Sequence, residues 1–346
     1  MQVRSQGFEL KTDYFVSDNG LRIRTGHASM PGLNADIKGE LLDWSSPRLA
    51  LGGDVEIRLD ALSPETTKSI PALKELELSG TLRGPFRLDG PWDRPLEWNF
   101  GVDAESPLIL AKRSLRFENF KLQVRMQDRR FSLPYIRANF YGGTLGSQIH
   151  FDLSKAVPTF DSRTQLNAVN LSKLGPDLTP PNRSLSGMLV GRLDLAGIAG
   201  LSESYRGDGA MSITQGHLFQ TDQFKEMGRL PLVKVEGLDL VTFHAMSAIF
   251  QVRDKKILTD NLTLMSETVD LSLRGSADFD GALDMLMNVQ YSEEVYLGAQ
   301  DTGGFVPLVV RQAGNLISQY RVRGTLKKPE YIKAGLPVRL MSVVVN

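Results

Sequence analysis

The chain has 346 residues, with 40 basic and 40 acidic side chains and a formal net charge of zero at pH 7. This balance offers no basic field for nucleic acid or for an anionic membrane surface, so neither is an expected partner. There is no cysteine, which excludes disulfides, thiolate metal sites and cysteine nucleophiles.

No window approaches 18 consecutive apolar residues, so the sequence predicts no transmembrane helix. Residues Met1 to Arg4 lack the apolar core of a signal peptide and lead directly into strand-like sequence. We therefore expect a fragment whose export segment is missing, with any membrane association supplied by that missing segment.

Residues 1–75 are predicted to form an N-terminal β segment that ends in a short helix. Alternation of apolar and polar residues over 21–24 and 54–59 indicates strands. Ser63 and Pro64 are typical of the start of a helix.

Residues 76–174 are predicted to form a first β-meander repeat. Its strands surround the polar turn at 127–130 and a glycine pair at 142–143, and the last clear strand ends at Leu153. The proline-rich passage 174–182 is the best candidate for a boundary.

Residues 185–335 are predicted to form a second β repeat, followed by an apolar tail at 336–346. Apolar residues at helical spacing indicate helices near 222–234 and 305–320. The clearest strands lie within 240–291, where every second side chain is apolar on one parity and polar on the other.

The two repeats resemble each other at nearly constant spacing. Asp128 and Asp254 lie 126 residues apart (254 − 128), and Phe151 and Phe279 lie 128 apart (279 − 151). This spacing favours serial β units, although alternating strands also resemble one another by chance.

Several segments carry a resemblance to a known family. The segments are 138–145, 185–195, 209–219, 279–284 and 322–329, all strand-and-glycine patterns. Together they resemble the C-terminal region of the AsmA-like family. The resemblance implies a bridge-like lipid-transfer protein of the diderm bacterial periplasm, with an inner-membrane anchor in the full-length protein and a role in carrying phospholipid towards the outer membrane.

The expected fold class is mainly β, with repeated antiparallel meanders and two or three short helices. So few helices leave a long apolar sheet face uncovered, so the sheet either packs as a sandwich or curls into a groove. A groove would hold acyl chains by burial alone, at about 0.8 kcal/mol per methylene. The candidates for lipid contact are Leu262, Leu264, Val269, Leu271, Leu273, Phe279, Leu283 and Met285.

Signatures of catalysis are absent from the sequence. The four histidines (His27, His150, His217 and His244) are far apart and form no metal-binding motif. The aspartates of 278–284 superficially match a calcium loop, but Val289 stands where the bidentate glutamate is needed. We expect no catalytic residue, no metal and no cofactor.

These patterns predict a non-enzymatic envelope protein of AsmA type that holds or conducts phospholipid, or another acyl lipid, along an apolar sheet groove. The alternative is a structural or assembly scaffold for outer-membrane biogenesis that binds envelope protein partners and carries no lipid. A polysaccharide-cleaving enzyme is disfavoured because the acidic residues are scattered.

Overall fold

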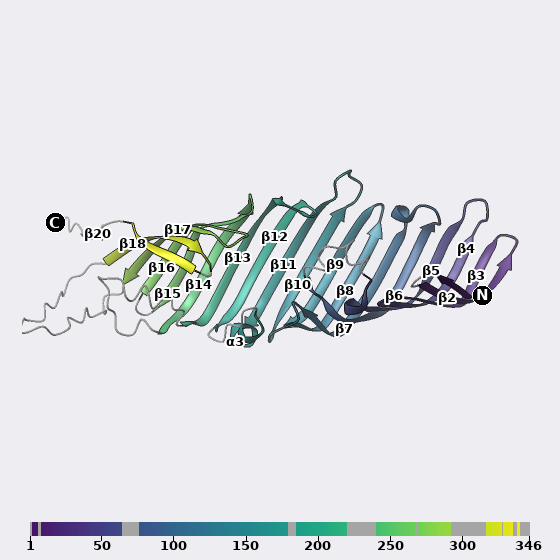
Figure 1. Cartoon of the computed structure of the whole chain (residues 1–346), viewed down its shortest axis with the longest axis horizontal. Coiled ribbons are helices and arrows are strands. Elements are labelled where there is room, and N and C mark those ends of the chain that lie inside the picture. The colour runs from purple at the N-terminus through teal and green to yellow at the C-terminus, as the bar shows by residue number, and fades with distance from the viewer. Residues whose placement is uncertain are drawn as a thin grey trace, which may run out of the picture. The chain divides into compact units, whose positions relative to one another are not determined.

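The computed structural model describes residues 2–5, 8–63, 76–178, 185–219, 240–266, 269–291, 316–326, 328–334 and 338–339. The chain divides into two compact units. Unit 1 comprises Met1–Val169 and Asp194–Ser202, and unit 2 comprises Asn170–Leu193 and Glu203–Asn346. Figure 1 shows the strands in chain order.

Unit 1 is an antiparallel meander in which each strand pairs with the next along the chain. Its strands are β1 (Gln2–Ser5), β2 (Phe8–Ser17), β3 (Gly20–Met30), β4 (Leu33–Leu42), β5 (Arg48–Arg58), β6 (Ser79–Pro91), β7 (Asn99–Ala111), β8 (Leu115–Gln127), β9 (Arg130–Phe140), β10 (Gly143–Asp152) and β11 (Thr159–Asn170). Strand β12 (Met188–Ile198) continues the chain across the division between the units.

Unit 2 continues the same pattern, with β18 also paired to the short β20. Its strands are β13 (Leu201–Phe219), β14 (Leu240–Arg253), β15 (Lys256–Ser266), β16 (Val269–Asp278), β17 (Leu283–Tyr291), β18 (Leu316–Thr325), β19 (Lys328–Lys333) and β20 (Val338–Arg339).

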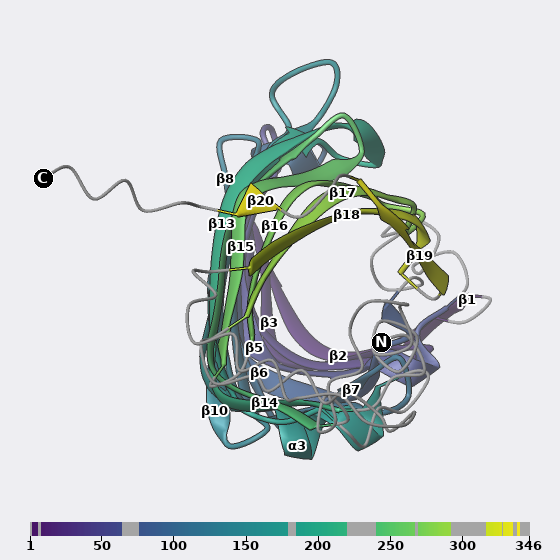
Figure 2. The same cartoon turned by 90° about the vertical axis from the view of Figure 1, so that its left-hand side faces the viewer.

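The predicted fold class is confirmed: the protein is mainly β, with open antiparallel meanders. Alternating apolar and polar residues give each strand one apolar and one polar side, and pairing places the apolar sides on one face. Within each unit, the described strands are bent rather than flat, as the end view in Figure 2 shows. Of the two arrangements left open by the sequence, the structure has the open sheet rather than the closed sandwich.

The repeated turn predicted at Asp128 and Asp254 has the same geometry in both places. Asp128 and Arg129 have φ of 49° and 60°, and Asp254 and Lys255 have φ of 52° and 58°. Two successive residues with positive φ are typical of the two-residue hairpin turn that matches the twist of antiparallel strands. The similarity of the two sequence segments therefore corresponds to two equivalent hairpins, β8–β9 and β14–β15.

Helices contribute little to the described part of the chain. It contains one short α-helix, α3 (Leu171–Leu174), whose first turn is capped by the Asn170 side chain, and three 3₁₀ turns at Leu59–Ala61, Pro95–Glu97 and Gly175–Asp177. The helix predicted for 305–320 is wrong for residues 316–320, which begin strand β18 because β17 offers them a ladder of hydrogen-bond partners. The rest of that prediction, the helix near 222–234 and most of the helix after Ser63 lie outside the described residues.

Candidate functional site: the apolar face

The apolar face of unit 1 carries a continuous row of large side chains. Residues directly opposite each other on paired strands project from the same face, so the strand register defines the row. From β5 to β11 the successive partners are Leu51, Leu88, Phe100, Met126, Phe131, Phe151 and Phe160. We call these seven residues the open row.

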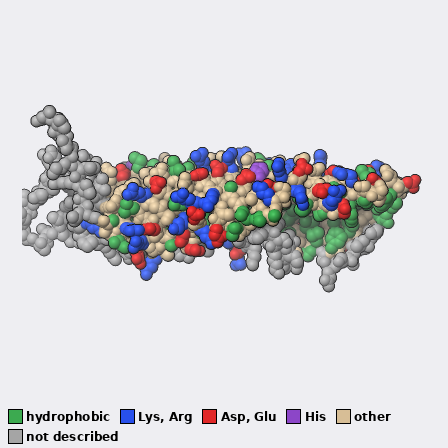
Figure 3. Space-filling model, turned by 90° about the horizontal axis from the view of Figure 1, so that it is seen from above, with side chains coloured by type: hydrophobic (Ala, Val, Ile, Leu, Met, Phe, Trp, Pro, Cys, Tyr) green, Lys and Arg blue, Asp and Glu red, His purple; other side chains and the backbone are tan. Residues whose placement is uncertain are grey.

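Every side chain of the open row is partly accessible, neither buried nor fully exposed. At its C-terminal end the aromatic rings pack on one another. The ring centroids of Phe131 and Phe151 are 5.9 Å apart, and those of Phe151 and Phe160 are 6.1 Å apart. Among the described residues, no second layer fully covers the row, which therefore presents a partly accessible apolar surface. Figure 3 shows hydrophobic side chains gathered in a recess below the charged edge, towards the N-terminal end of unit 1.

The length of the open row matches the scale of a lipid. Seven neighbouring strands, spaced about 4.8 Å apart, give a row of roughly 29 Å. The hydrocarbon core of a bilayer is about 30 Å thick and contains two leaflets, so one acyl chain spans about half of the row.

A second part of the same face is packed more tightly. Leu82, Val102, Ala104 and Ile109 form a buried cluster, and Ile109 is only 2% exposed. The hydroxyl of Ser106, also buried here, donates to the Leu108 carbonyl oxygen at 2.9 Å, so its polar group is satisfied. This cluster stabilises the sheet beside the open row.

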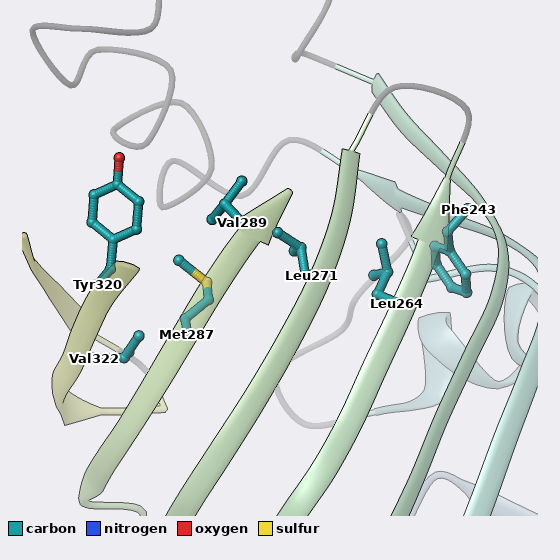
Figure 4. Packing of buried hydrophobic residues seen from close by; sticks show 7 residues of the cluster. All are labelled: Phe243, Leu264, Leu271, Met287, Val289, Tyr320 and Val322. Carbon is teal, nitrogen blue, oxygen red and sulfur yellow. The ribbon is translucent and has the colours of Figure 1, made fainter. Parts of the chain in front are cut away.

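The apolar face of unit 2 is a core rather than an open surface. Its buried cluster, drawn in Figure 4, consists of Phe243, Leu264, Leu271, Met287, Val289, Tyr320 and Val322. These side chains come from β14 to β18, and the strand register places Leu264, Leu271 and Val289 in one row across three strands.

The eight predicted lipid contacts do not form a single accessible site. Leu264 and Leu271 are buried in the unit 2 cluster, and Leu273, Leu283 and Met285 pack against it. Two other candidates remain on strands: Leu262 lies opposite Leu273, and the backbone of Val269 begins β16.

Phe279 is wrongly placed by the alternation pattern. It follows the last residue of β16 and lies in the turn to β17, where its side chain is 44% exposed. Its backbone N–H donates to the Lys255 carbonyl oxygen at 2.9 Å, which ties this turn to the β14–β15 turn. Phe279 therefore lies at the edge of the sheet and outside the buried cluster.

The opposite face is polar in both units. In unit 1, ion pairs join neighbouring strands, including Arg83–Glu56 at 2.7 Å and Arg125–Asp103 at 2.6 Å. In unit 2, uncharged side chains form a ladder in which Ser247 and Thr263 hydroxyls lie 2.9 Å apart and the Gln319 amide donates to Asn288 at 3.0 Å. Each unit thus has one face for water and one for apolar groups.

The open row was missed as a site, although its residues follow the same two-residue alternation as the predicted candidates. Sequence alone does not give the register that aligns Phe100, Met126 and Phe131. A β-bulge is also not visible in the sequence. At Asn119, which has φ of 49°, the alternation shifts by one residue, so Phe117 and Phe120 both pack against the buried cluster around Ile109.

Catalytic geometry is not found in the described residues. No group of three or more histidine or acidic side chains there could hold a metal ion. His27 instead lies on the polar face, with its Nδ1 3.0 Å from the Asp36 carboxylate. No helix in the described ranges has the length and hydrophobicity to cross a bilayer.

Comparison with known proteins adds no relative: no family model, curated protein or solved structure matches this chain.

Proposed function

We propose that this protein is a non-enzymatic envelope protein of AsmA type that holds phospholipid by its acyl chains along the apolar sheet face. The observation that carries the proposal is the open row of unit 1, a firm and partly accessible apolar track of roughly 29 Å. The periplasmic location, the inner-membrane anchor of the full-length protein and transport towards the outer membrane rest on the sequence resemblance alone.

The chemistry of the open row suits acyl chains and lacks features that would select other ligands. All seven side chains are hydrocarbon or thioether, so they offer no hydrogen bonds to a sugar, nucleotide or peptide backbone. Binding then depends on removing methylenes from water, a contribution that is non-directional and is spread along the row. A chain bound in this way can slide from strand to strand, as a conducting groove requires.

The test is native mass spectrometry with lipid extraction on protein purified gently from a diderm bacterial host. We expect phospholipid to co-purify with the unsubstituted protein and to be lost in Phe131→Asp, which places a charge in the middle of the open row. The control is Tyr135→Asp, which makes the same kind of change on the same strand but on the polar face, opposite Gln123. It should keep the lipid.

A lipid-free mass in every preparation, with no uptake of added phospholipid, would overturn the proposal and favour a scaffold that binds only protein. Equal loss of lipid in both variants, with both still folded by circular dichroism, would also contradict it, because the polar face has no role in the proposed binding.

A further inference from the structure

One edge of unit 1 collects all the tryptophan of the chain. The three tryptophans are Trp44, Trp92 and Trp98, which lie in or beside the β4–β5 and β6–β7 connections. The Trp44 side chain is 47% exposed and that of Trp92 is 61% exposed. These connections lie at the upper edge of the sheet in Figure 1, together with the β2–β3 turn.

Hydrogen bonds connect the β2–β3, β4–β5 and β6–β7 connections to one another along this edge. The Asp43 N–H donates to the Asn19 carbonyl oxygen at 2.8 Å, and the Trp92 N–H donates to the Pro47 carbonyl oxygen at 2.9 Å. The indole N–H of Trp44 donates to the Ser17 carbonyl oxygen at 3.2 Å. The Trp44 ring is therefore anchored by its polar atom while much of its apolar surface faces solvent.

Other large apolar side chains project from the same turns. Val16 is 53% exposed, Leu42 43% and Leu96 46%. Val16 lies near the end of β2, Leu42 ends β4, and Leu96 belongs to the 3₁₀ turn after β6. We call Val16, Leu42, Trp44, Trp92 and Leu96 the tryptophan edge.

Charges around the tryptophan edge are paired and mixed in sign. Arg94 lies 2.9 Å from Glu97, and Arg48 lies 3.2 Å from Asp89. The Asp43 carboxylate accepts hydrogen bonds from Ser45, which lower the pKa of Asp43 and keep it charged. Figure 3, which looks onto this edge, shows no field of one sign. An anionic membrane surface therefore gains no electrostatic attraction at this edge, and a zwitterionic membrane surface meets no electrostatic repulsion.

We propose that the tryptophan edge docks on a zwitterionic phospholipid bilayer, with the rings of Trp44 and Trp92 at headgroup level. Tryptophan favours that interface because its ring is apolar and its N–H is polar. The apolar side chains stand on successive turns between charged ones. Apolar side chains interspersed with charged ones can enter the headgroup region of a bilayer. A protein interface instead has a continuous, desolvated apolar core, which this edge lacks.

Docking at this edge has a consequence for lipid binding. Leu51 lies three residues after the start of β5, and Leu88 lies three residues before the end of β6, so the open row runs just inside the tryptophan edge. Docking would place the open row beside the bilayer, where an acyl chain could pass between them. This consequence rests on the proposed lipid-holding function, whereas the docking itself does not.

The experiment uses the intrinsic fluorescence of the three tryptophans, measured as phosphatidylcholine vesicles are added. We expect a blue shift, quenching by brominated phosphatidylcholine, and binding no tighter to vesicles that contain phosphatidylglycerol. The double variant Trp92→Ser/Leu96→Ser should lose about tenfold or more in vesicle co-sedimentation. The control Ile249→Ser removes a side chain that is 60% exposed on the polar face of unit 2, and it should bind vesicles normally.

Two further readouts separate docking from acyl-chain binding. Trp92→Ser/Leu96→Ser should still bind a soluble acyl-chain probe such as cis-parinaric acid, and Phe131→Asp should still bind vesicles. The docking proposal would be overturned if vesicles caused no blue shift, or if the double variant and the unsubstituted protein bound vesicles equally. Either result would favour a protein partner for this edge. If the unsubstituted protein binds vesicles but does not bind cis-parinaric acid, only the lipid-holding function is overturned.

Discussion

The open row predicts how affinity depends on the length of an acyl chain. The sheet is open, so it covers about one side of each methylene, and the gain per methylene should be about half of the full value of about 0.8 kcal/mol. About 0.4 kcal/mol corresponds to a factor of about two in dissociation constant. Six further methylenes, from a twelve-carbon to an eighteen-carbon fatty acid, should then tighten binding by roughly 60-fold.

The assay is displacement of bound cis-parinaric acid by saturated fatty acids below their aggregation concentrations. Affinity should rise steadily with chain length, because even the longest chain is shorter than the row of roughly 29 Å. In Phe131→Asp the uninterrupted row shrinks to the run from Leu51 to Met126, three strand steps or about 14 Å, so the gain should stop at shorter chains. Affinity that is independent of length, or a sharp cut-off at a short length in the unsubstituted protein, would refute an open track and indicate a closed pocket.

Three further predictions concern the sheet itself. Gly216→Ala should destabilise the protein by about 1–3 kcal/mol in chemical denaturation, because a Cβ there would collide with the ring of Phe243; an unchanged midpoint would show that the ring moves freely. Phe243→Ala should cost about 3–5 kcal/mol, since Phe243 is 3% exposed within the unit 2 cluster; a loss below 1 kcal/mol would contradict its role in the core. Hydrogen bonds from Ser154 lower the pKa of Asp152, so the stability they provide is present above its ordinary pKa and is lost as the pH falls through the lowered value. Ser154→Ala removes the side-chain hydrogen bond and keeps the backbone one, so the pKa of Asp152 should move upwards towards its ordinary value in an NMR titration of the carboxyl carbon; an unchanged pKa would exclude the Ser154 hydroxyl as a cause.

Much of the strand pattern was predictable because alternation is a direct consequence of a sheet with one wet face. The apolar parity of Leu271 and Leu273 and the polar parity of Ser272 were correct, and Ser272 faces Asn288 on the polar side. The alternation failed at strand ends, where Phe279 belongs to a turn. Alternation is also weak in the glycine-rich passage 197–209, which nevertheless forms parts of β12 and β13.

The site was less predictable than the fold, because it depends on register and on what covers the sheet. Periodicity identifies Leu264 and Phe131 equally well as apolar-face residues, yet Leu264 is buried and Phe131 is partly accessible. That difference arises from the packing around each face, which no local pattern records. The tryptophan edge did leave a signal, because every tryptophan lies next to proline or polar turn residues, as Pro91-Trp92-Asp93 does.

Site-specific photo-crosslinking in living diderm bacteria tests whether lipid lies along the open row. A photoreactive amino acid is placed in turn at Phe100, Met126 and Phe151 of the open row and at Gln123 and Tyr135 of the polar face, and phosphate-labelled lipid adducts are counted. We expect adducts at the open-row positions and none at the polar-face positions. Adducts of equal yield on both faces, or none on either, would contradict this expectation.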